Sequence, residues 1–151
     1  LEANEPDLKV AALEAFARVE TIPAKLTPIF ISALRDPLED LRRPAIEGFG
    51  RLGKEANGAV KPLVKLLDSD DTIQVALEAL RQIRFRDVGL YIQLMKHKSP
   101  SARSFACERL GRLGNLAEEA LPILRILAED DSESYVRRRA QDAVRRIEDK
   151  D

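Results

Sequence analysis

Apolar residues recur at helical spacing in five separate segments of this chain, and short polar turns lie between the segments. In the first segment the apolar stripe comprises Leu8, Ala12, Leu13, Phe16 and Val19. The same spacing predicts helices over residues 8–19, 40–52, 72–84, 102–113 and 135–147. No useful length alternates with a period of two, so we expect no strand.

An alanine stands at the same place in each of these five segments. Aligning "DLKVAALEAFARV" (7–19) with "DLRRPAIEGFGRL" (40–52) and the three later segments brings five anchor alanines into register: Ala12, Ala45, Ala76, Ala106 and Ala140. Their spacings of 33, 31, 30 and 34 residues are the signature of a repeat array. We expect these alanines to be buried where neighbouring helices cross.

A second amphipathic segment follows each of the first four, over residues 24–35, 57–68, 87–97 and 117–129. Each repeat is therefore a first helix, a turn and a second helix. The sequence predicts a single all-α domain, an α-solenoid of about four and a half repeats. The predicted repeats span about 7–36, 37–69, 70–98 and 99–131, with a C-terminal half-repeat at 132–151.

Glycine and proline punctuate the repeats at corresponding places. Gly53 and Gly114 should end their helices at a positive φ, and Gly50 and Gly111 should let a neighbouring helix approach closely. The second helices should begin or bend near three prolines: Pro28, Pro62 and Pro122.

The third repeat is the irregular one. It has Arg81 where its neighbours have glycine, and "QIRFRD" where they have "RLG". We expect a local change in the angle between repeats at this place.

The strings "RRPAIEGFGRLG" and "AVKPLVKLLDSDD" resemble the short, armadillo-type HEAT-like repeats that are also found in phycobilisome lyases. The resemblance implies an α-solenoid with first helices on the outer curve and second helices on the inner curve. It also implies that an arginine early in the first helix bonds to an aspartate of a neighbouring turn. The matching arginines are Arg42, Arg103 and Arg137, with Lys9 in the first repeat. The third repeat departs from this pattern, with Ile73 and Gln74. An anion-binding stripe is the alternative role of the arginines, and the structural role is favoured.

Composition narrows the possible functions. The 151 residues carry 25 basic and 26 acidic groups, so the net charge of −1 gives no general attraction to nucleic acid or to an anionic membrane. No apolar run is long enough to span a bilayer. A single cysteine excludes an internal disulfide framework and multi-cysteine metal sites. A reducing, cytoplasmic compartment is compatible with this, although the sequence does not fix the location.

Catalytic chemistry is not expected. His97 lies near a helix end, where a favourable interaction with the helix dipole explains its presence. Cys107 falls on the core face beside an anchor alanine, so we expect a buried, unreactive thiol. The acidic turns "DSDD" and "EDDSE" lack the spacing of a calcium loop and suit helix capping. We therefore expect no catalytic residue, no metal site and no cofactor.

Binding is the use that a solenoid offers, because its second helices form an extended inner surface. Aligning the second helices on their prolines, and the third by its apolar stripe, brings Ile31, Lys65, Gln93 and Arg125 into register. With Lys61, Tyr91 and Lys96 nearby, these residues form the candidate partner-binding face. The predicted function is a non-catalytic scaffold that binds a protein partner along this face. A nucleic-acid-binding HEAT-like module and a chromophore-handling subunit of the bilin-lyase type are the alternatives, and nucleic acid is disfavoured by the charge balance.

The two ends of the sequence differ. Residues 1–12 align with residues 34–45, so we expect the chain to be the C-terminal part of a longer array. The first helix has extra apolar residues, including Val10 and Ala11, which suggests self-association or a protein contact through the N-terminal end. The arginine-rich segment 136–147 has the thin apolar stripe of a C-terminal cap.

Overall fold

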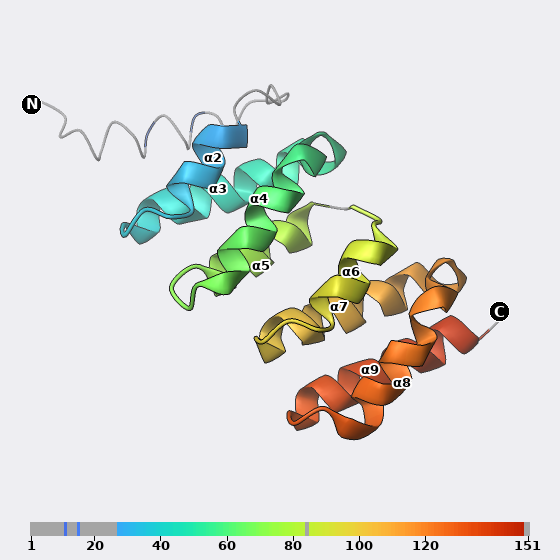
Figure 1. Cartoon of the computed structure of the whole chain (residues 1–151). Helices are drawn as coiled ribbons and strands as arrows, with labels where there is room; N and C mark the ends of the chain where they lie inside the picture. Colours follow the sequence, from blue (N-terminus) through green and yellow to red (C-terminus); the bar gives the residue numbers. More distant parts are fainter. Residues whose placement is uncertain (1–10, 12–14, 16–26, 84, 150–151) are drawn as a thin grey trace, which may run out of the picture. The chain divides into compact units, whose positions relative to one another are not determined.

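A computed structural model describes residues 11, 15, 27–83 and 85–149, in two compact units that comprise residues 1–85 and 86–151. Within the described ranges every regular element is a helix, as predicted (Figure 1). Of the helix predicted over 8–19, only Ala11 and Ala15 are described. That helix, Lys9 and the proposed N-terminal contact therefore lie outside the described residues.

The N-terminal unit contains α2 (Thr27–Ala33), α3 (Glu39–Leu52), α4 (Val60–Lys65) and α5 (Ile73–Gln82). Two 3₁₀ segments, Gly53–Ala59 and Leu66–Asp68, flank α4. α3 packs against α2 and α5, and α4 packs on α5. In Figure 1 the second helices α2 and α4 lie in front of the first helices α3 and α5, so this unit has two layers.

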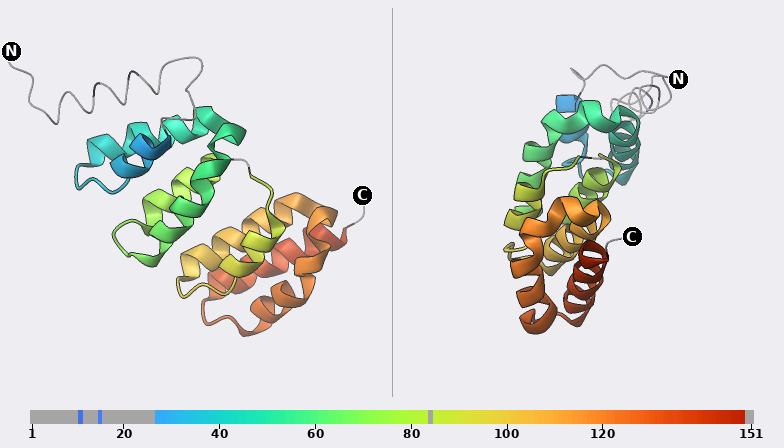
Figure 2. Two further views of the ribbon diagram at one scale, coloured as in Figure 1. Left: turned by 45° about the horizontal axis from the view of Figure 1, so that its top comes forward. Right: turned by 90° about the vertical axis from the view of Figure 1, so that its right-hand side faces the viewer.

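The C-terminal unit contains α6 (Val88–Leu94), α7 (Pro100–Leu113), α8 (Leu121–Asp130) and α9 (Ser134–Glu148), with a 3₁₀ segment at Gly114–Ala120. α7 packs against α6 and α9, and α8 packs along α9. The second view in Figure 2 shows α8 and α9 side by side, in orange and dark red. The predicted first helices over 40–52, 72–84, 102–113 and 135–147 are confirmed to within two residues at each end.

The described anchor alanines form the centre of the helix contacts. Ala45, Ala76, Ala106 and Ala140 all have no exposed surface, as predicted. Gly111 also behaves as predicted, because a Cβ added there would lie 3.0 Å from the backbone Cα of Ala143. Gly50 differs, because it is exposed and a Cβ there would meet only the flexible side chain of Gln82, at 3.2 Å from Oε1.

Aromatic pairs fill the space between the two layers. The rings of Phe30 and Phe49 pack at a centroid distance of 5.8 Å. Phe30 also lies on Gly48, where an added Cβ would be 2.6 Å from Cε1 of the ring, so this glycine makes room for the aromatic side chain.

Gly53 and Gly114 end α3 and α7 with positive φ values of 51° and 56°. The positive φ confirms the prediction, but the ψ values of −119° and −134° are those of the first central residue of a type II′ turn and not of a left-handed helix. Only glycine adopts this conformation at little cost, which explains why "RLG" recurs. The predicted proline effect is confirmed for the starts of α2 and α8, where proline is the second residue, and α4 has Pro62 as its third residue.

Candidate functional site

Burial fixes the register of the second helices. One position in each is fully buried: Phe30 in α2, Leu63 in α4, Tyr91 in α6 and Leu124 in α8. Leu63 and Leu124 each follow their anchor alanine by 18 residues, whereas Tyr91 follows its anchor by 15. The third repeat is therefore shorter by three residues between its two helices.

Two rows of exposed side chains follow from this register. The residue two positions beyond the buried one is exposed in every second helix: Ser32, Lys65, Gln93 and Ile126. The residue five positions beyond it is exposed as well: Arg35, Asp68, Lys96 and Glu129. These eight residues are called the second-helix surface below, and each unit carries four of them.

The proline-based alignment of the candidate residues was wrong by one position. Pro28 and Pro122 precede the buried position by two residues, but Pro62 precedes it by one. Lys65 therefore corresponds to Ile126 and not to Arg125. A proline marks where a helix can begin, whereas burial against the neighbouring helix sets its rotation.

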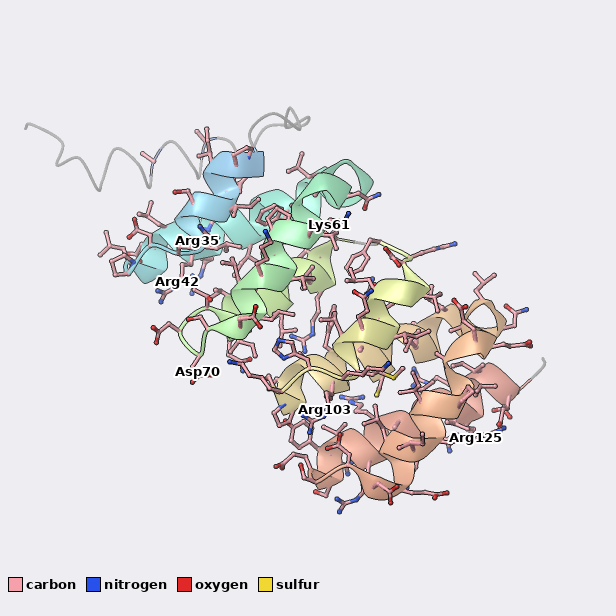
Figure 3. The ribbon with its side chains drawn as sticks, viewed as in Figure 1. Arg35, Arg42, Lys61, Asp70, Arg103 and Arg125 are labelled. Atoms are coloured by element: carbon pink, nitrogen blue, oxygen red, sulfur yellow. The ribbon has the colours of Figure 1, made fainter. Side chains whose placement is uncertain are left out.

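In the N-terminal unit, Lys61 and Lys65 are exposed on α4, and Ile31 on α2 is half-buried. Neither lysine forms an ion pair with another described residue. Figure 3 shows Lys61 near the start of α4 and Arg35 at the end of α2, both in the second-helix layer of this unit.

In the C-terminal unit, Gln93 and Lys96 are exposed on α6. Arg125 on α8 is exposed too (Figure 3), and its guanidinium group pairs with Glu148 of α9 at 2.5 Å. Both residues line a groove of about 380 Å³ between α8 and α9, together with Ala128 and Val144.

Tyr91 does not belong to the partner-binding face beside which the sequence analysis placed it. Its side chain is fully buried, its ring packs edge-on against Phe105 at 6.1 Å, and its hydroxyl oxygen accepts a hydrogen bond from Nε of Arg109 at 3.3 Å. Burial raises the pKa of Tyr91, partly offset by this hydrogen bond. Tyr91 is a core residue, because the shorter third repeat places it at the buried position.

The three arginines that the resemblance singled out share one set of contacts. In each, Nη1 donates to the backbone carbonyl oxygens of the residues six and five positions earlier, in the turn before the helix. The acceptors are Asp36 and Pro37 for Arg42, His97 and Lys98 for Arg103, and Asp131 and Ser132 for Arg137. Each guanidinium group thus binds the turn that leads into its own helix.

Arg103 also reaches the turn of the following repeat. Its Nε and Nη2 donate to the two carboxylate oxygens of Asp131 at 2.7 and 2.8 Å, which is a bidentate pair. The Asp131 side chain is 2% exposed and the Arg103 side chain 14%. The hydrogen bonds from Arg103 lower the pKa of Asp131, and the same bonds raise the pKa of Arg103. An anion could bind at Arg103 only by displacing Asp131.

The third repeat closes its turn with a different group. Thr72, immediately before α5, donates from Oγ1 to the carbonyl oxygen of Leu66, six residues earlier, at 2.7 Å. A hydroxyl therefore makes the contact that a guanidinium makes in the other described repeats. This hydrogen bond of Thr72 was not predicted from the sequence, because the family pattern requires a cation at Ile73 or Gln74.

His97 takes the place of an aspartate. Nδ1 of His97 accepts a hydrogen bond from the backbone N–H of Ser99 at 3.0 Å. At the same register position, carboxylate oxygens of Asp36 and Asp131 accept from the backbone N–H two residues later, also at 3.0 Å. The alignment of Arg42, Arg103 and Arg137 would have revealed this equivalence, because all three turn residues lie six positions before an arginine.

Cys107 is fully buried, as predicted, and burial raises the pKa of its thiol to about 12. The carboxylate of Asp131 contributes to the same direction. A thiol in this state is a poor nucleophile at neutral pH.

Among the described residues there is no group of histidine, cysteine and acidic side chains that could hold a metal ion. No buried polar side-chain atom in the described ranges lacks a hydrogen-bond partner. No described helix is both long enough and apolar enough to cross a membrane.

The comparisons with known proteins agree with this architecture. The family model for HEAT repeats matches residues 1–84 and again residues 62–145. A search of curated proteins gives no match.

Three solved structures with designed or engineered chains are similar in fold. A designed armadillo repeat protein has a TM-score of 0.52 at 22% identity, over 97% of this chain and 78% of that one. Computationally designed armadillo repeat proteins for modular peptide recognition give 0.55 at 22% identity with the same coverage. An engineered protein gives 0.54 at 19% identity, over 97% of this chain and 76% of that one. The predicted all-α solenoid class and the HEAT-like resemblance are both confirmed.

Proposed function

Because the chain belongs to the HEAT-repeat family, we propose that it is a non-catalytic protein-interaction scaffold. On each unit the proposed contact face is its four residues of the second-helix surface, with Ile31 and Lys61 beside them in the N-terminal unit and Arg125 in the C-terminal unit. HEAT-type repeats bury their cores between neighbouring helix pairs, which leaves the exposed positions of the second helices for recognition.

The main support for this proposal is the chemical variety of the side chains at one register position. The same exposed place holds a small hydroxyl in Ser32, a cation in Lys65, an amide in Gln93 and a 59% exposed aliphatic side chain in Ile126. The adjacent row alternates in sign within each unit: Arg35 and Asp68 in one, Lys96 and Glu129 in the other. A mixed set of this kind suits a peptide of defined sequence better than a uniform polyanion.

A peptide-like partner is also supported by one of the similar proteins, which was designed for modular peptide recognition. At 22% identity that likeness carries the fold alone. It supports the proposal only in that stacked helix pairs can serve this purpose.

We propose that the chain is not catalytic because its thiol and its imidazole are both engaged in the structure. The thiol of Cys107 is buried with a raised pKa, and Nδ1 of His97 accepts a backbone hydrogen bond. A catalytic site needs a nucleophile or base that a substrate can reach.

The test is selection from a random peptide library displayed on phage, with the whole chain as bait. The selected peptides are then titrated against Lys65→Glu and Gln93→Lys, which change one exposed residue in each unit. Arg43→Glu on α3 and Gln74→Lys on α5 are matched controls, because both residues are exposed on first helices.

We expect at least one second-helix variant to bind the selected peptides about tenfold more weakly, which corresponds to about 1.4 kcal/mol. The controls should stay within about twofold. The proposal fails if the library gives no binder, or if the first-helix controls lose affinity while both second-helix variants keep it.

A further inference from the structure

The last first helix, α9, exposes four arginines on one face. Arg138, Arg139, Arg145 and Arg146 are all exposed, whereas the opposite face buries Val136, Ala140, Ala143 and Ile147. Because the helix is amphipathic, the arginines are fixed to a rigid surface and are not part of a loose tail. These four residues are called the arginine face below.

Most of this positive charge is not neutralised within the described structure. Arg145 pairs with Asp142 at 2.8 Å. Arg138, Arg139 and Arg146 form no ion pair with any described residue. Three of the four guanidinium groups are therefore open to an anion from outside the described structure.

The repeat itself does not require arginine at these positions. In register with the anchor alanines, α7 has Ser104, Phe105, Gly111 and Arg112 where α9 has the four arginines. Phe105 and Gly111 are buried in α7. Among the described first helices, α3 has arginine at two of the four positions and α5 and α7 at one each, so arginine at all four is particular to α9.

The spacing of the arginine face suits a short row of carboxylates. Arg138 and Arg145, like Arg139 and Arg146, are seven residues apart, which is about 10.5 Å along a helix. Carboxylates at that separation occur seven residues apart in a helical peptide, or about three residues apart in an extended one. Guanidinium groups bind carboxylates through two parallel hydrogen bonds, which adds geometric specificity to the attraction.

We propose that the arginine face of α9 is a second docking surface, which binds an acidic peptide segment of a partner protein. This surface lies on a first helix, so it is separate from the second-helix surface, and either can exist without the other.

The surroundings favour a short acidic peptide over a nucleic acid. The arginine face extends only about 12 Å along the helix. Acidic residues bound it at both ends, Glu133 before α9 and Glu148 and Asp149 at its end, and Asp142 lies in its middle. A phosphate backbone runs on continuously and would meet these carboxylates, whereas a short acidic segment ends before them.

The test is fluorescence anisotropy with a labelled peptide of about twelve residues that has Glu at each third position. Its counterpart with Gln at those positions controls for charge, and a single-stranded oligonucleotide of matched charge controls for the class of ligand. The protein is the whole chain, at about 50 and 150 mM salt. The variant is Arg138→Glu with Arg139→Glu, and the matched control is Arg43→Glu with Arg86→Glu, which makes the same change of charge at two exposed arginines outside both proposed surfaces.

We expect the Glu peptide to bind the unchanged chain at least about tenfold more tightly than the Gln peptide at the lower salt concentration. The α9 variant should lose at least about tenfold in affinity, and the control variant should stay within about threefold. If the α9 double variant melts earlier than the unchanged chain, Arg138→Gln and Arg139→Gln singly replace it.

Three outcomes would overturn the proposal. The first is equal binding, or no binding, of the Glu and Gln peptides. The second is an equal loss in the control variant, which would show only a general attraction of opposite charges. The third is tighter binding of the oligonucleotide at the arginine face, which would make it a nucleic-acid surface.

Discussion

Helices α5 and α7 belong to the same repeat array, but different groups fix their ends. At its start α7 has Arg103, which binds two carbonyl oxygens of its own turn and the carboxylate of Asp131 in the next. At its start α5 has Thr72, which binds the single carbonyl oxygen of Leu66. At its end α7 has Gly111 against Ala143 and then Gly114 at positive φ, whereas α5 has exposed Arg81 beside Glu78 and then extended Ile83.

The difference shows which part of a repeat can vary. In both repeats the backbone carbonyl oxygen six residues before Thr72 or Arg103 needs a hydrogen-bond donor. A hydroxyl group provides this donor as well as a guanidinium group does. Reaching the next turn requires the longer side chain. The α7 repeat is therefore tied to its successor by a buried ion pair, and Thr72 has no means to make such a contact.

The largest expected effect is at Asp131. Replacing it with Ala leaves the guanidinium of Arg103 mostly buried with only carbonyl partners, and we expect a loss of about 3 kcal/mol in the free energy of unfolding. Denaturant titration, followed by a signal from the C-terminal unit, measures this loss in the free energy of unfolding. The double variant with Arg103→Ala should be less destabilised than the sum of the single variants, because neither charge then stays unpaired. Additive losses would contradict a direct pair.

The same pair predicts an acid-sensitive stability. The pKa of Asp131 is lowered in the folded state, so its contribution is complete above its usual value near pH 4 and is lost as the pH falls through the lowered folded value. Between pH 5 and 3 the unchanged chain should lose more stability than Asp131→Asn. Parallel acid curves for the two proteins would show that other carboxylates dominate.

A smaller effect is expected where α7 and α5 differ in packing. Gly111→Ala places a Cβ 3.0 Å from the backbone Cα of Ala143, and overpacking of this kind costs roughly 1–3 kcal/mol. Arg81→Ala at the same register position in α5 removes an exposed ion pair, and we expect a change within about 0.5 kcal/mol. Thermal denaturation of both variants makes the comparison. Equal thermal midpoints for the two variants would mean that α9 can shift away from α7 without a loss of stability.

The turn before α5 provides the next test. Thr72→Val removes the hydroxyl and leaves the carbonyl oxygen of Leu66 without this partner, which should cost about 1 kcal/mol. Thr72→Ser keeps the donor and should recover most of that loss. Urea midpoints of the two variants that coincide would show that the hydrogen bond is not what Thr72 contributes.

The smallest effect is expected at His97. Asp occupies this register position in the turns of Asp36 and Asp131, so His97→Asp should keep the hydrogen bond from the backbone of Ser99 and change stability by at most about 0.5 kcal/mol. His97→Ala should cost about 1 kcal/mol, because the turn loses its acceptor. The order of the melting temperatures checks both, and a lower value for His97→Asp than for His97→Ala would contradict the equivalence.

Much of the fold could be predicted from apolar spacing, because a repeat imposes the same burial on each copy. The anchor alanines illustrate this, since a small residue at a helix crossing is both a sequence signal and a packing requirement. The register of the second helices could not be predicted from Pro62, because proline restricts where a helix begins and not which side faces the core. Tyr91 was misplaced for a different reason, because its helix has no proline and only the packed structure shows that it fills the position of Leu63 and Leu124.

Less of the candidate site than of the fold could be predicted from the sequence. Arg42, Arg103 and Arg137 could be found from the family pattern, but their acceptors are backbone carbonyl oxygens, which have no sequence signal. Asp131 could not be distinguished from Asp130 beside it without knowing which carboxylate turns inward. The exposed rows on the second helices depend on the same helix rotation and so had to await the structure.

Cys107 gives this chain a built-in reporter of local opening. It is the single thiol in the sequence and has no exposed surface, so an alkylating reagent reaches it only when the packing around α7 opens transiently. The alkylation rate, divided by that of an unstructured thiol, then gives the equilibrium constant for opening at one place in residues 86–151. Because residues 1–85 contain no cysteine, the signal reports opening of the C-terminal unit alone, without a single substitution.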